Sequence, residues 1–303
     1  MARKPFPRPG RRAGTDARSG WGAAARSGRR SDLRRRQRAE LSDRPDNQEH
    51  MTALSFKDLL AAIEGRSADF RDAASRSDPA ARVPGCPDWS LADLVAHLGE
   101  VQRFWATVVM AGPSPTPPAD DLVIGREPQG DLLAWSAAGT DALIRALSEA
   151  GPDRGCWTWW AASGAPMTAA AVARHQMQEA AVHSFDAQET GGSAGPLPAD
   201  MAADCLGEFL TVTVPMSGTW PHEPARLTLE AAGSRAWLVD LSRERTLAQP
   251  AGSVQAEPPP AAAARGSASD IVLALYGRRP AEILDITGSR PLIEQFLAWP
   301  DSD

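Results

Sequence analysis

The sequence of 303 residues contains few cysteines and no long hydrophobic run, and both scarcities limit what the protein can be. Its three cysteines, Cys86, Cys156 and Cys205, are widely spaced and form no CxxC pair. An odd number of scattered cysteines fits a reducing compartment better than a disulfide framework. No apolar run reaches the ~18 residues of a transmembrane helix, and no segment resembles a signal peptide. A cytoplasmic protein that does not span a membrane is therefore expected.

Lysine is also scarce, since only Lys4 and Lys57 occur and the other basic residues are arginine. The net charge of -6 conceals a division within the chain. Residues 1–50 hold 14 basic and 6 acidic residues, whereas the remainder holds 18 basic and 32 acidic residues. An acidic body argues against a nucleic-acid-binding fold, because such folds carry a positive surface.

Residues 1–50 are rich in Arg, Gly, Ser and Pro and hold too few apolar side chains for a core. This composition predicts a disordered leader. An Arg-rich leader is also compatible with a transit peptide or a nucleic-acid-binding tail. Met51 opens a segment that resembles a natural N-terminus, so the leader is also interpreted as an over-extended gene start.

Residues 51–195 show the periodicity of helices, with apolar side chains recurring every three or four residues. The predicted helices begin near Phe56, Ser90, Leu132 and Ala169. Ser90 is a predicted N-cap, with Asp93 three residues later near the positive end of the helix dipole. Pro84 and Pro87 are expected to break the chain before it. Four helices joined by loops predict a helical bundle.

Residues 199–303 have a different pattern, which predicts a small domain with both helices and strands. A first helix is expected at 199–212, and two alternating segments at 226–230 and 236–241 predict a hairpin. The Pro- and Ala-rich stretch 249–265 is expected to be a loop. A helix at 267–276, a strand at 282–287 and a closing helix at 291–299 are predicted to follow. The fold class is therefore α+β, with an N-terminal four-helix bundle followed by a small α/β C-terminal domain.

The strongest chemical signal is the pair Glu179 and His183 in the fourth predicted helix. Residues four apart lie on one helix face, about one turn from each other. His97, in the second predicted helix, offers another imidazole. Two imidazoles and one carboxylate form a three-ligand metal site that leaves a position open for chemistry. The set suits Zn²⁺, although Ni²⁺, Fe²⁺ or Mn²⁺ would bind the same groups.

Simpler interpretations of these residues exist. Glu and His at this spacing are common on solvated helices, and His97 beside an apolar stripe is also typical of a hydrogen-bonded core histidine. The stronger HExxH motif is absent. His175, one turn before the glutamate, is a rival ligand. Asp186 and Asp93 lie close enough in sequence to the two histidines to orient their rings.

For two further groups of residues, the sequence is compatible with more than one role. Cys86 precedes the second helix and is a candidate fourth ligand, a reactive thiol or a small buried side chain. Trp157, Trp159 and Trp160 form an aromatic cluster that either lines a pocket or packs in the core.

Three segments of the sequence carry a resemblance to a known family. The first is Val83-Pro-Gly-Cys-Pro-Asp-Trp-Ser-Leu-Ala-Asp-Leu-Val-Ala-His97-Leu-Gly, the second is Arg174-x4-Glu179-x3-His183-x2-Asp186, and the third covers residues 269–280. In this order the three segments resemble the maleylpyruvate isomerase family of mycothiol-dependent enzymes. Together they extend the resemblance over residues 53–300. Asp88 stands where the family often has Gly, and Tyr276 stands where Trp is more usual. The substitution near Arg278 puts the identity of the substrate in doubt.

The resemblance implies a DinB-like bundle in which His97, Glu179 and His183 hold a divalent metal, zinc above all. It also implies an arginine of the C-terminal domain that reaches the substrate, with Arg278 as first choice and Arg279 as second. The alternative interpretation of these two arginines is purely structural, as a pair of cations favoured by the dipole at a helix C-terminus. The implied cofactor is mycothiol, whose thiolate at the metal attacks a small electrophile.

This chemistry implies either cis-trans isomerisation of a maleylpyruvate-type substrate or S-transfer. The expected partners are therefore a small-molecule electrophile and a low-molecular-weight thiol, with no nucleic acid and no membrane, and a monomer is expected. A non-catalytic metal-binding or regulatory bundle remains an alternative. So does a metal-dependent hydrolase, in which the metal activates water in place of a thiol.

Overall fold

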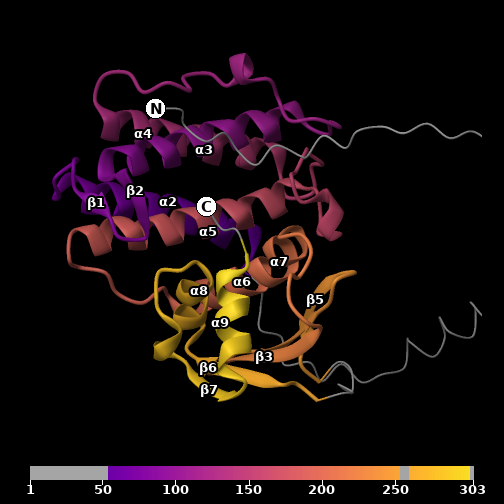
Figure 1. The fold of residues 1–303 in the computed structure, drawn as a ribbon. Helices are drawn as coiled ribbons and strands as arrows, with labels where there is room; N and C mark the ends of the chain where they lie inside the picture. Colours follow the sequence, from indigo (N-terminus) through magenta and orange to yellow (C-terminus); the bar gives the residue numbers. More distant parts are fainter. Residues whose placement is uncertain (1–53, 253–258, 301–303) are drawn as a thin grey trace, which may run out of the picture. The chain divides into compact units, whose positions relative to one another are not determined.

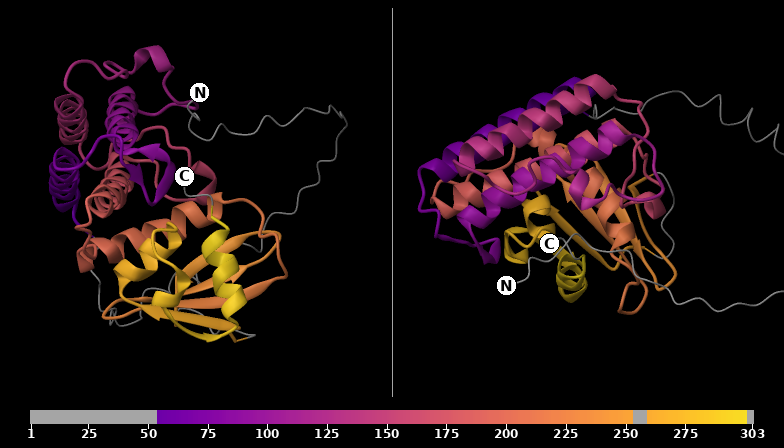
Figure 2. Two further views of the ribbon diagram at one scale, coloured as in Figure 1. Left: turned by 60° about the vertical axis from the view of Figure 1, so that its left-hand side comes forward. Right: turned by 90° about the horizontal axis from the view of Figure 1, so that it is seen from above.

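In the computed structural model, residues 54–252 and 259–300 are described, and the first part of this chain is helical (Figure 1). Its long helices are α2 (Phe56–Ser75), α3 (Leu91–Ala111), α4 (Leu132–Ala150) and α5 (Ala169–Thr190). Helix α2 packs against α5 and α4, and α3 packs against α4 and α5, which forms the predicted bundle (Figure 2). None of the described helices combines the length and apolarity needed to cross a membrane. The predicted leader lies outside the described residues.

The start of α3 is fixed by the capping box that the sequence predicted. The Ser90 hydroxyl donates to Asp93 Oδ2 at 2.6 Å, and the Asp93 amide donates to Ser90 Oγ at 3.2 Å. This exchange satisfies backbone donors that the first helical turn would otherwise leave free. It also fixes where α3 begins, and therefore places His97 in its second turn.

Helices α3 and α4 approach closely because glycines face each other between them. A Cβ on Gly99 would collide with the ring of Trp135, and a Cβ on Gly139 would lie 2.9 Å from the Gly99 carbonyl oxygen. The buried guanidinium of Arg103 donates to that carbonyl at 2.9 Å and to the Trp135 carbonyl at 2.5 Å. The contact therefore satisfies a buried charge with backbone oxygens.

A short hairpin that the sequence did not predict joins α2 to α3. Strands β1 (Arg82–Val83) and β2 (Cys86–Ser90) pair in antiparallel fashion, with Pro84 and Pro87 in and beside the turn. Proline is tolerated here because each strand of a two-stranded sheet is an edge strand. The hairpin packs against α3 and α5 and so carries Cys86 and Trp89 toward the interior of the bundle.

The C-terminal part contains a mixed sheet in the order β5-β4-β3-β6-β7. Its strands are β3 (Ala225–Ala231), β4 (Ala236–Leu241), β5 (Thr246–Pro250), β6 (Ala262–Gly266) and β7 (Asp285–Gly288). Only β3 and β6 pair in parallel among these strands. Helices α8 (Ala268–Leu275) and α9 (Arg290–Ala298) pack against β3 and β6. The α+β class is confirmed.

The predicted loop at 249–265 was wrong at both ends, because β5 extends into it and β6 begins inside it. Strand β6 is built mainly of alanines, of which Ala262 and Ala264 are buried. A run of small, uniform side chains hides the alternation that identifies a strand. The strand predicted at 282–287 also begins later than expected, because a 3₁₀ turn at Ala281–Ile283 precedes β7.

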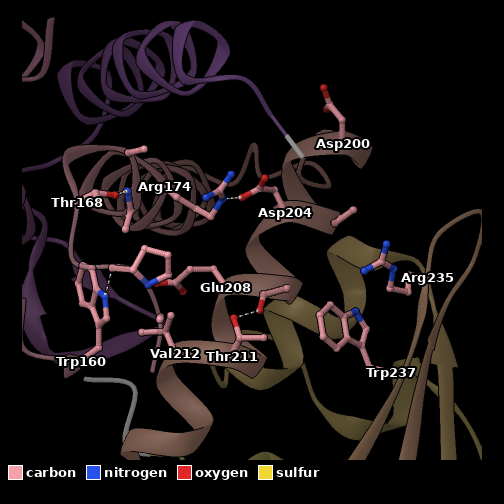
Figure 3. A pocket seen from close by; sticks show the side chains of 16 residues that line it. Trp160, Thr168, Arg174, Asp200, Asp204, Glu208, Thr211, Val212, Arg235 and Trp237 are labelled. Atoms are coloured by element: carbon pink, nitrogen blue, oxygen red, sulfur yellow. Dashed lines mark hydrogen bonds and ion pairs between the residues drawn. The ribbon is translucent and has the colours of Figure 1, made fainter. Parts of the chain in front are cut away.

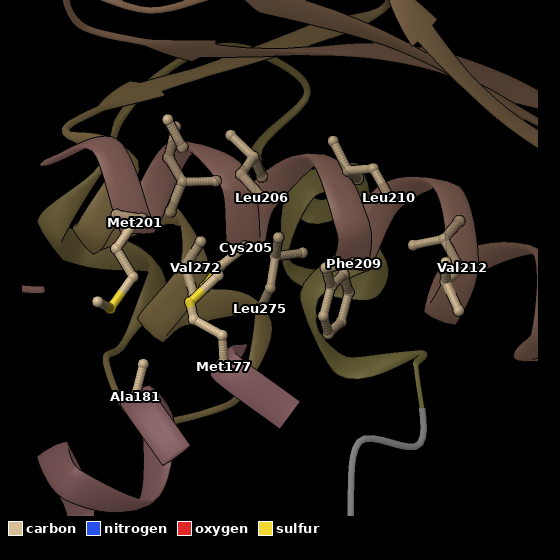
Figure 4. Close-up of a cluster of buried hydrophobic side chains, with 14 of the residues drawn as sticks. Met177, Ala181, Met201, Cys205, Leu206, Phe209, Leu210, Val212, Val272 and Leu275 are labelled. Atoms are coloured by element: carbon tan, nitrogen blue, oxygen red, sulfur yellow. The ribbon is translucent and has the colours of Figure 1, made fainter. Parts of the chain in front are cut away.

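Helix α6 (Ala199–Glu208) continues through a π-helical turn, Phe209–Thr213, into α7 (Val214–Met216). The predicted helix at 199–212 therefore exists, but its last four residues are π-helical. Figure 4 shows side chains of α5, α6 and α8 in one apolar cluster, and α6 packs against both of the other helices. The labelled members include Met177 and Ala181 of α5, Cys205 and Phe209 along α6 and the π-helical turn, and Val272 and Leu275 of α8. The bundle and the sheet thus share a continuous core.

Candidate metal centre

The three predicted ligands, which lie up to 86 residues apart in the sequence, come together between α3 and α5. His97 Nε2 lies 3.3 Å from Glu179 Oε1, and His183 Nε2 lies 3.7 Å from the same oxygen. The two imidazole rings meet edge to face, with their centroids 5.2 Å apart. The Glu179 carboxylate therefore lies within reach of both ring nitrogens.

The donor atoms of these residues fit a small divalent cation. One atom from each of His97, Glu179 and His183 lies within 4.8 Å of the others. Two neutral imidazole nitrogens and one carboxylate oxygen form the donor set of many catalytic zinc sites. The His183 side chain is 9% exposed, whereas those of His97 and Glu179 are 30% and 23% exposed. The open side of the set is thus at His97 and Glu179.

Charge interactions at the three groups are strong. Burial alone would raise the pKa of Glu179, but hydrogen bonds and charges from His183 and His97 bring that pKa well below its ordinary value. Burial opposes protonation of His183, yet Asp186 and Glu179 together raise its pKa to about 9. The site therefore favours a positive charge next to Glu179, as a cation-binding site requires.

Asp186 holds the ring of His183 from the other side. The Nδ1–H of His183 donates to Asp186 Oδ2 at 2.9 Å, which leaves Nε2 directed at Glu179. The Asp186 carboxylate is fully buried and also accepts two hydrogen bonds from Arg278, each 3.1 Å long. Burial would raise the pKa of Asp186, but His183 and Arg278 lower it below its usual value. A charged carboxylate therefore fixes the tautomer and orientation of the histidine.

Arg278 enters this cluster from the turn after α8. Its side chain is 3% exposed, and it also donates to the Tyr276 carbonyl at 2.6 Å and to Cys86 Sγ at 3.1 Å. Gly85 is required beside it, because a Cβ there would lie 2.6 Å from Asp186 Oδ1 and 2.8 Å from Arg278 Nε. The arginine predicted to reach the substrate therefore contacts the carboxylate that orients a candidate ligand.

The rival ligand and the second-choice arginine have other partners. His175 Nδ1 lies 3.1 Å from Glu208 Oε1, away from the candidate ligands. Arg279 pairs with Glu189 at 2.5 Å and lies over the Phe185 ring. Neither side chain belongs to the donor sets found among the described residues.

Cys86 belongs to a second set of potential donors beside the first. Its sulfur lies 3.9 Å from Asp186 Oδ2, and it forms a group with that carboxylate and His183 within 4.8 Å. The Asp186 carboxylate already accepts hydrogen bonds from His183 and Arg278. A metal bound by this second set would therefore compete with those hydrogen bonds. The remaining cysteines, Cys156 and Cys205, are buried and free.

Two aromatic residues adjoin the site without having been singled out as functional. The Trp89 ring centroid lies 4.6 Å from that of His97 and 6.4 Å from that of His183. Tyr276 accepts a hydrogen bond at its hydroxyl from Gln178 of α5. The signal for Trp89 was its place just after the paired prolines. Tyr276 was noted in the sequence only as a departure from the family's pattern, and its contact with Gln178 joins residues 98 positions apart.

Comparisons with known proteins agree with this architecture. Residues 60–188 match the family described as "Mycothiol maleylpyruvate isomerase N-terminal domain", and residues 197–295 match the "MDMPI C-terminal domain". The crystal structure of the mycothiol-dependent maleylpyruvate isomerase aligns with a TM-score of 0.54 and 16% identity, covering 80% of this chain and 98% of that chain. A histidine-to-alanine mutant of that isomerase gives the same values. At this identity the two crystal structures establish a shared fold. No curated protein sequence matches the chain significantly.

Proposed function

The chain belongs to the mycothiol-dependent maleylpyruvate isomerase family, and on this premise we propose that it is a metal- and mycothiol-dependent enzyme acting on a small electrophile. The observation that carries the proposal is the convergence of His97, Glu179 and His183 within 4.8 Å. The reaction class is cis-trans isomerisation of a maleylpyruvate-type compound, with S-transfer as the related alternative.

In this proposal, His97, Glu179 and His183 hold a divalent metal, with zinc favoured by the donor set. The bound metal would supply Lewis acidity, which lowers the pKa of a thiol and makes the nucleophilic thiolate available near neutral pH. The chain contributes a preformed pair of imidazoles, kept in position by helices α3 and α5. Exposure of His97 and Glu179 gives the thiol and its electrophile a side from which to approach.

Arg278 acts in this proposal as a positioning residue. Its two hydrogen bonds keep Asp186 charged, and Asp186 in turn holds the Nδ1–H of His183. Residues that orient a metal-binding histidine contribute about 10–100-fold to metal affinity or activity. The Arg278 side chain is 3% exposed and bound to three neighbours, so most of its N–H groups already have acceptors within the protein.

The proposed metal site is tested by metal analysis of purified variants. The wild-type protein is expected to retain about one divalent ion per chain after dialysis. His97→Ala and Glu179→Ala are each expected to lose it, because each removes one of three ligands. His222→Ala is the matched control, since this histidine is exposed and far from the site in the sequence. Full metal occupancy in the His97→Ala, Glu179→Ala double variant would refute the site.

The proposed thiol chemistry is tested on metal-loaded protein by calorimetry and by turnover. Mycothiol is expected to bind saturably, whereas glutathione is not, and maleylpyruvate is expected to isomerise only when mycothiol is present. Hydrolysis of an ester or amide without any thiol would instead select the hydrolase. Saturable metal binding with neither thiol binding nor turnover would select a non-catalytic bundle.

A further inference from the structure

The two candidate histidines are held in different ways. His183 donates from Nδ1 to the buried carboxylate of Asp186 at 2.9 Å. Among the described residues, the His97 ring has one hydrogen bond, between Nε2 and Glu179 Oε1 at 3.3 Å. Because this nitrogen faces Glu179, binding of a metal by both side chains would replace that hydrogen bond. The orientation of His97 in a metal-loaded site therefore needs another source.

The carboxylate that the sequence placed one turn before His97 is committed to the start of α3. Asp93 Oδ2 accepts from the Ser90 amide at 3.0 Å and from the Ser90 hydroxyl at 2.6 Å. A histidine that binds a metal usually has its second ring nitrogen bound to a carboxylate, a carbonyl or a water. Within residues 54–252 and 259–300, no side chain or carbonyl is hydrogen-bonded to His97 Nδ1.

The ring that lies against His97 is the indole of Trp89 on β2. The two ring centroids are 4.6 Å apart, and the planes are tilted by 47°. The Trp89 centroid also lies 6.4 Å from that of His183. Aromatic rings at such separations attract each other and favour particular relative orientations. The indole therefore restricts rotation of the His97 ring without using either of its nitrogens.

Trp89 is itself fixed by its place in the chain and by packing. It directly precedes Ser90, the N-cap of α3, and it packs against an apolar cluster that includes Leu94. An apolar residue before an N-cap often packs on the first turns of the helix in this way. Arg82 of β1 donates to the Asp88 carbonyl at 3.0 Å, which ties the two strands together just before Trp89. The indole is thus a rigid surface for the imidazole.

The same hairpin reaches the partners of the other histidine. A Cβ on Gly85 would lie 2.6 Å from Asp186 Oδ1 and 2.8 Å from Arg278 Nε, so the turn of the hairpin packs directly on the ion pair that orients His183. One short hairpin therefore contacts the groups that hold both imidazoles, with Trp89 on one side and its turn on the other.

We propose that Trp89 is a positioning residue of the metal centre, which holds the His97 ring as Asp186 holds that of His183. The inference rests on the proposed metal site and adds to it a side chain that binds no metal itself. An aromatic contact of this kind changes an equilibrium constant by about 3–10-fold. Loss of the indole is therefore expected to leave the His97 ring less ordered and to weaken metal binding.

The test compares Trp89→Leu and Trp89→Phe with the wild-type full chain. In metal-free protein, NMR of isotope-labelled histidine measures the order of the His97 ring, with its signals assigned through His97→Gln. Trp89→Leu is expected to lower this order, to bind Co²⁺ about 3–10-fold more weakly and to change the visible absorption of the bound Co²⁺. Trp89→Phe keeps a flat ring and is expected to show a smaller loss of each. It also supplies the comparison if the leucine variant does not fold.

Trp237→Leu is the matched control. Trp237 lies on β4 beside a cavity of about 340 Å³, which none of the candidate metal ligands lines (Figure 3). Its loss is expected to lower the thermal unfolding temperature and to leave the order of the His97 ring, the Co²⁺ affinity and the Co²⁺ spectrum unchanged. A purely structural role of Trp89 would give this same pattern.

Three results would overturn the proposal. They are an unchanged order of the His97 ring in both Trp89 variants, wild-type Co²⁺ affinity and spectrum in both, or the same loss of His97 order in Trp237→Leu. If the wild-type protein binds no metal, the proposed metal site fails. The order of the His97 ring in metal-free protein then still decides whether Trp89 positions it.

Discussion

The buried ion pair between Asp186 and Arg278 makes a prediction that can be measured without knowing the substrate. Asp186→Asn keeps the size of the side chain and its ability to accept from His183, but it removes the negative charge. Arg278, whose side chain is 3% exposed, would then lose its ion pair with this buried carboxylate. The converse variant, Arg278→Met, leaves the carboxylate with His183 as its hydrogen-bonding partner.

The expected magnitude follows from burial. Breaking a buried ion pair by removing one partner costs about 3–5 kcal/mol, because an uncompensated charge remains in a medium of low polarity. For a chain of this length, about 2–4 °C of unfolding temperature corresponds to each kcal/mol. Asp186→Asn is therefore expected to lower the unfolding temperature by roughly 10 °C. The double variant, Asp186→Asn with Arg278→Met, removes both charges of the pair. Its loss of unfolding free energy is therefore expected to be smaller than the sum of the two single losses by about 2–3 kcal/mol.

The assay is a double-mutant cycle by calorimetry on metal-free protein, so that changes in metal affinity do not enter the result. The surface pair Arg76–Asp72, with both side chains more than 60% exposed, serves as the matched control. It is expected to give a coupling below about 1 kcal/mol. Strictly additive single variants at Asp186 and Arg278, or losses as small as those of the surface pair, would refute the reasoning.

Two further predictions concern packing and thiol reactivity. Gly99→Ala is expected to lower the free energy of unfolding by about 1–3 kcal/mol, because its Cβ would collide with Trp135. Gly65→Ala, in open space on α2, is expected to raise the free energy of unfolding by ~0.5–1 kcal/mol, because alanine favours a helix more than glycine does. Denaturant titration compares the two, and equal effects would contradict the close helix contact. Burial raises the pKa of Cys156 to about 11 and that of Cys205 well above its ordinary value, so both thiols are expected to resist iodoacetamide at neutral pH until the protein unfolds. Mass spectrometry would contradict this if either carried the label in folded protein.

Helix positions were predictable because their signals are local. Helix α4 (Leu132–Ala150) begins where the sequence predicted, since Asp131 caps it, and Gly151 ends it within the same segment. Strand β6 was missed because its partner β3 lies more than thirty residues away and its own side chains are nearly uniform. Parallel pairing depends on contacts between distant segments, which a local pattern does not contain.

In the candidate site, too, the features that are local in the sequence were predictable, and those that depend on tertiary packing were not. The Glu179 and His183 spacing is a property of one helix, and it could be found in the sequence. The approach of His97 to that pair depends on how α3 packs on α5, and the resemblance to a family supplied it. The environment of Arg278 was not predictable from its own segment, because Asp186 and Cys86 come from elements far away in the sequence. Burial of the guanidinium is a consequence of tertiary packing.

The separation of 92 residues between Asp186 and Arg278 also sets an order of events during synthesis of the chain. At ~5–20 residues per second, a ribosome that has completed Asp186 needs roughly 5–20 s more to reach its counterion. During that interval the helices of the bundle are already made, while the carboxylate has His183 and Cys86 beside it but no arginine. Because an unpaired buried carboxylate is costly, we expect the nascent bundle to keep this end of α5 in contact with water until Arg278 has been made.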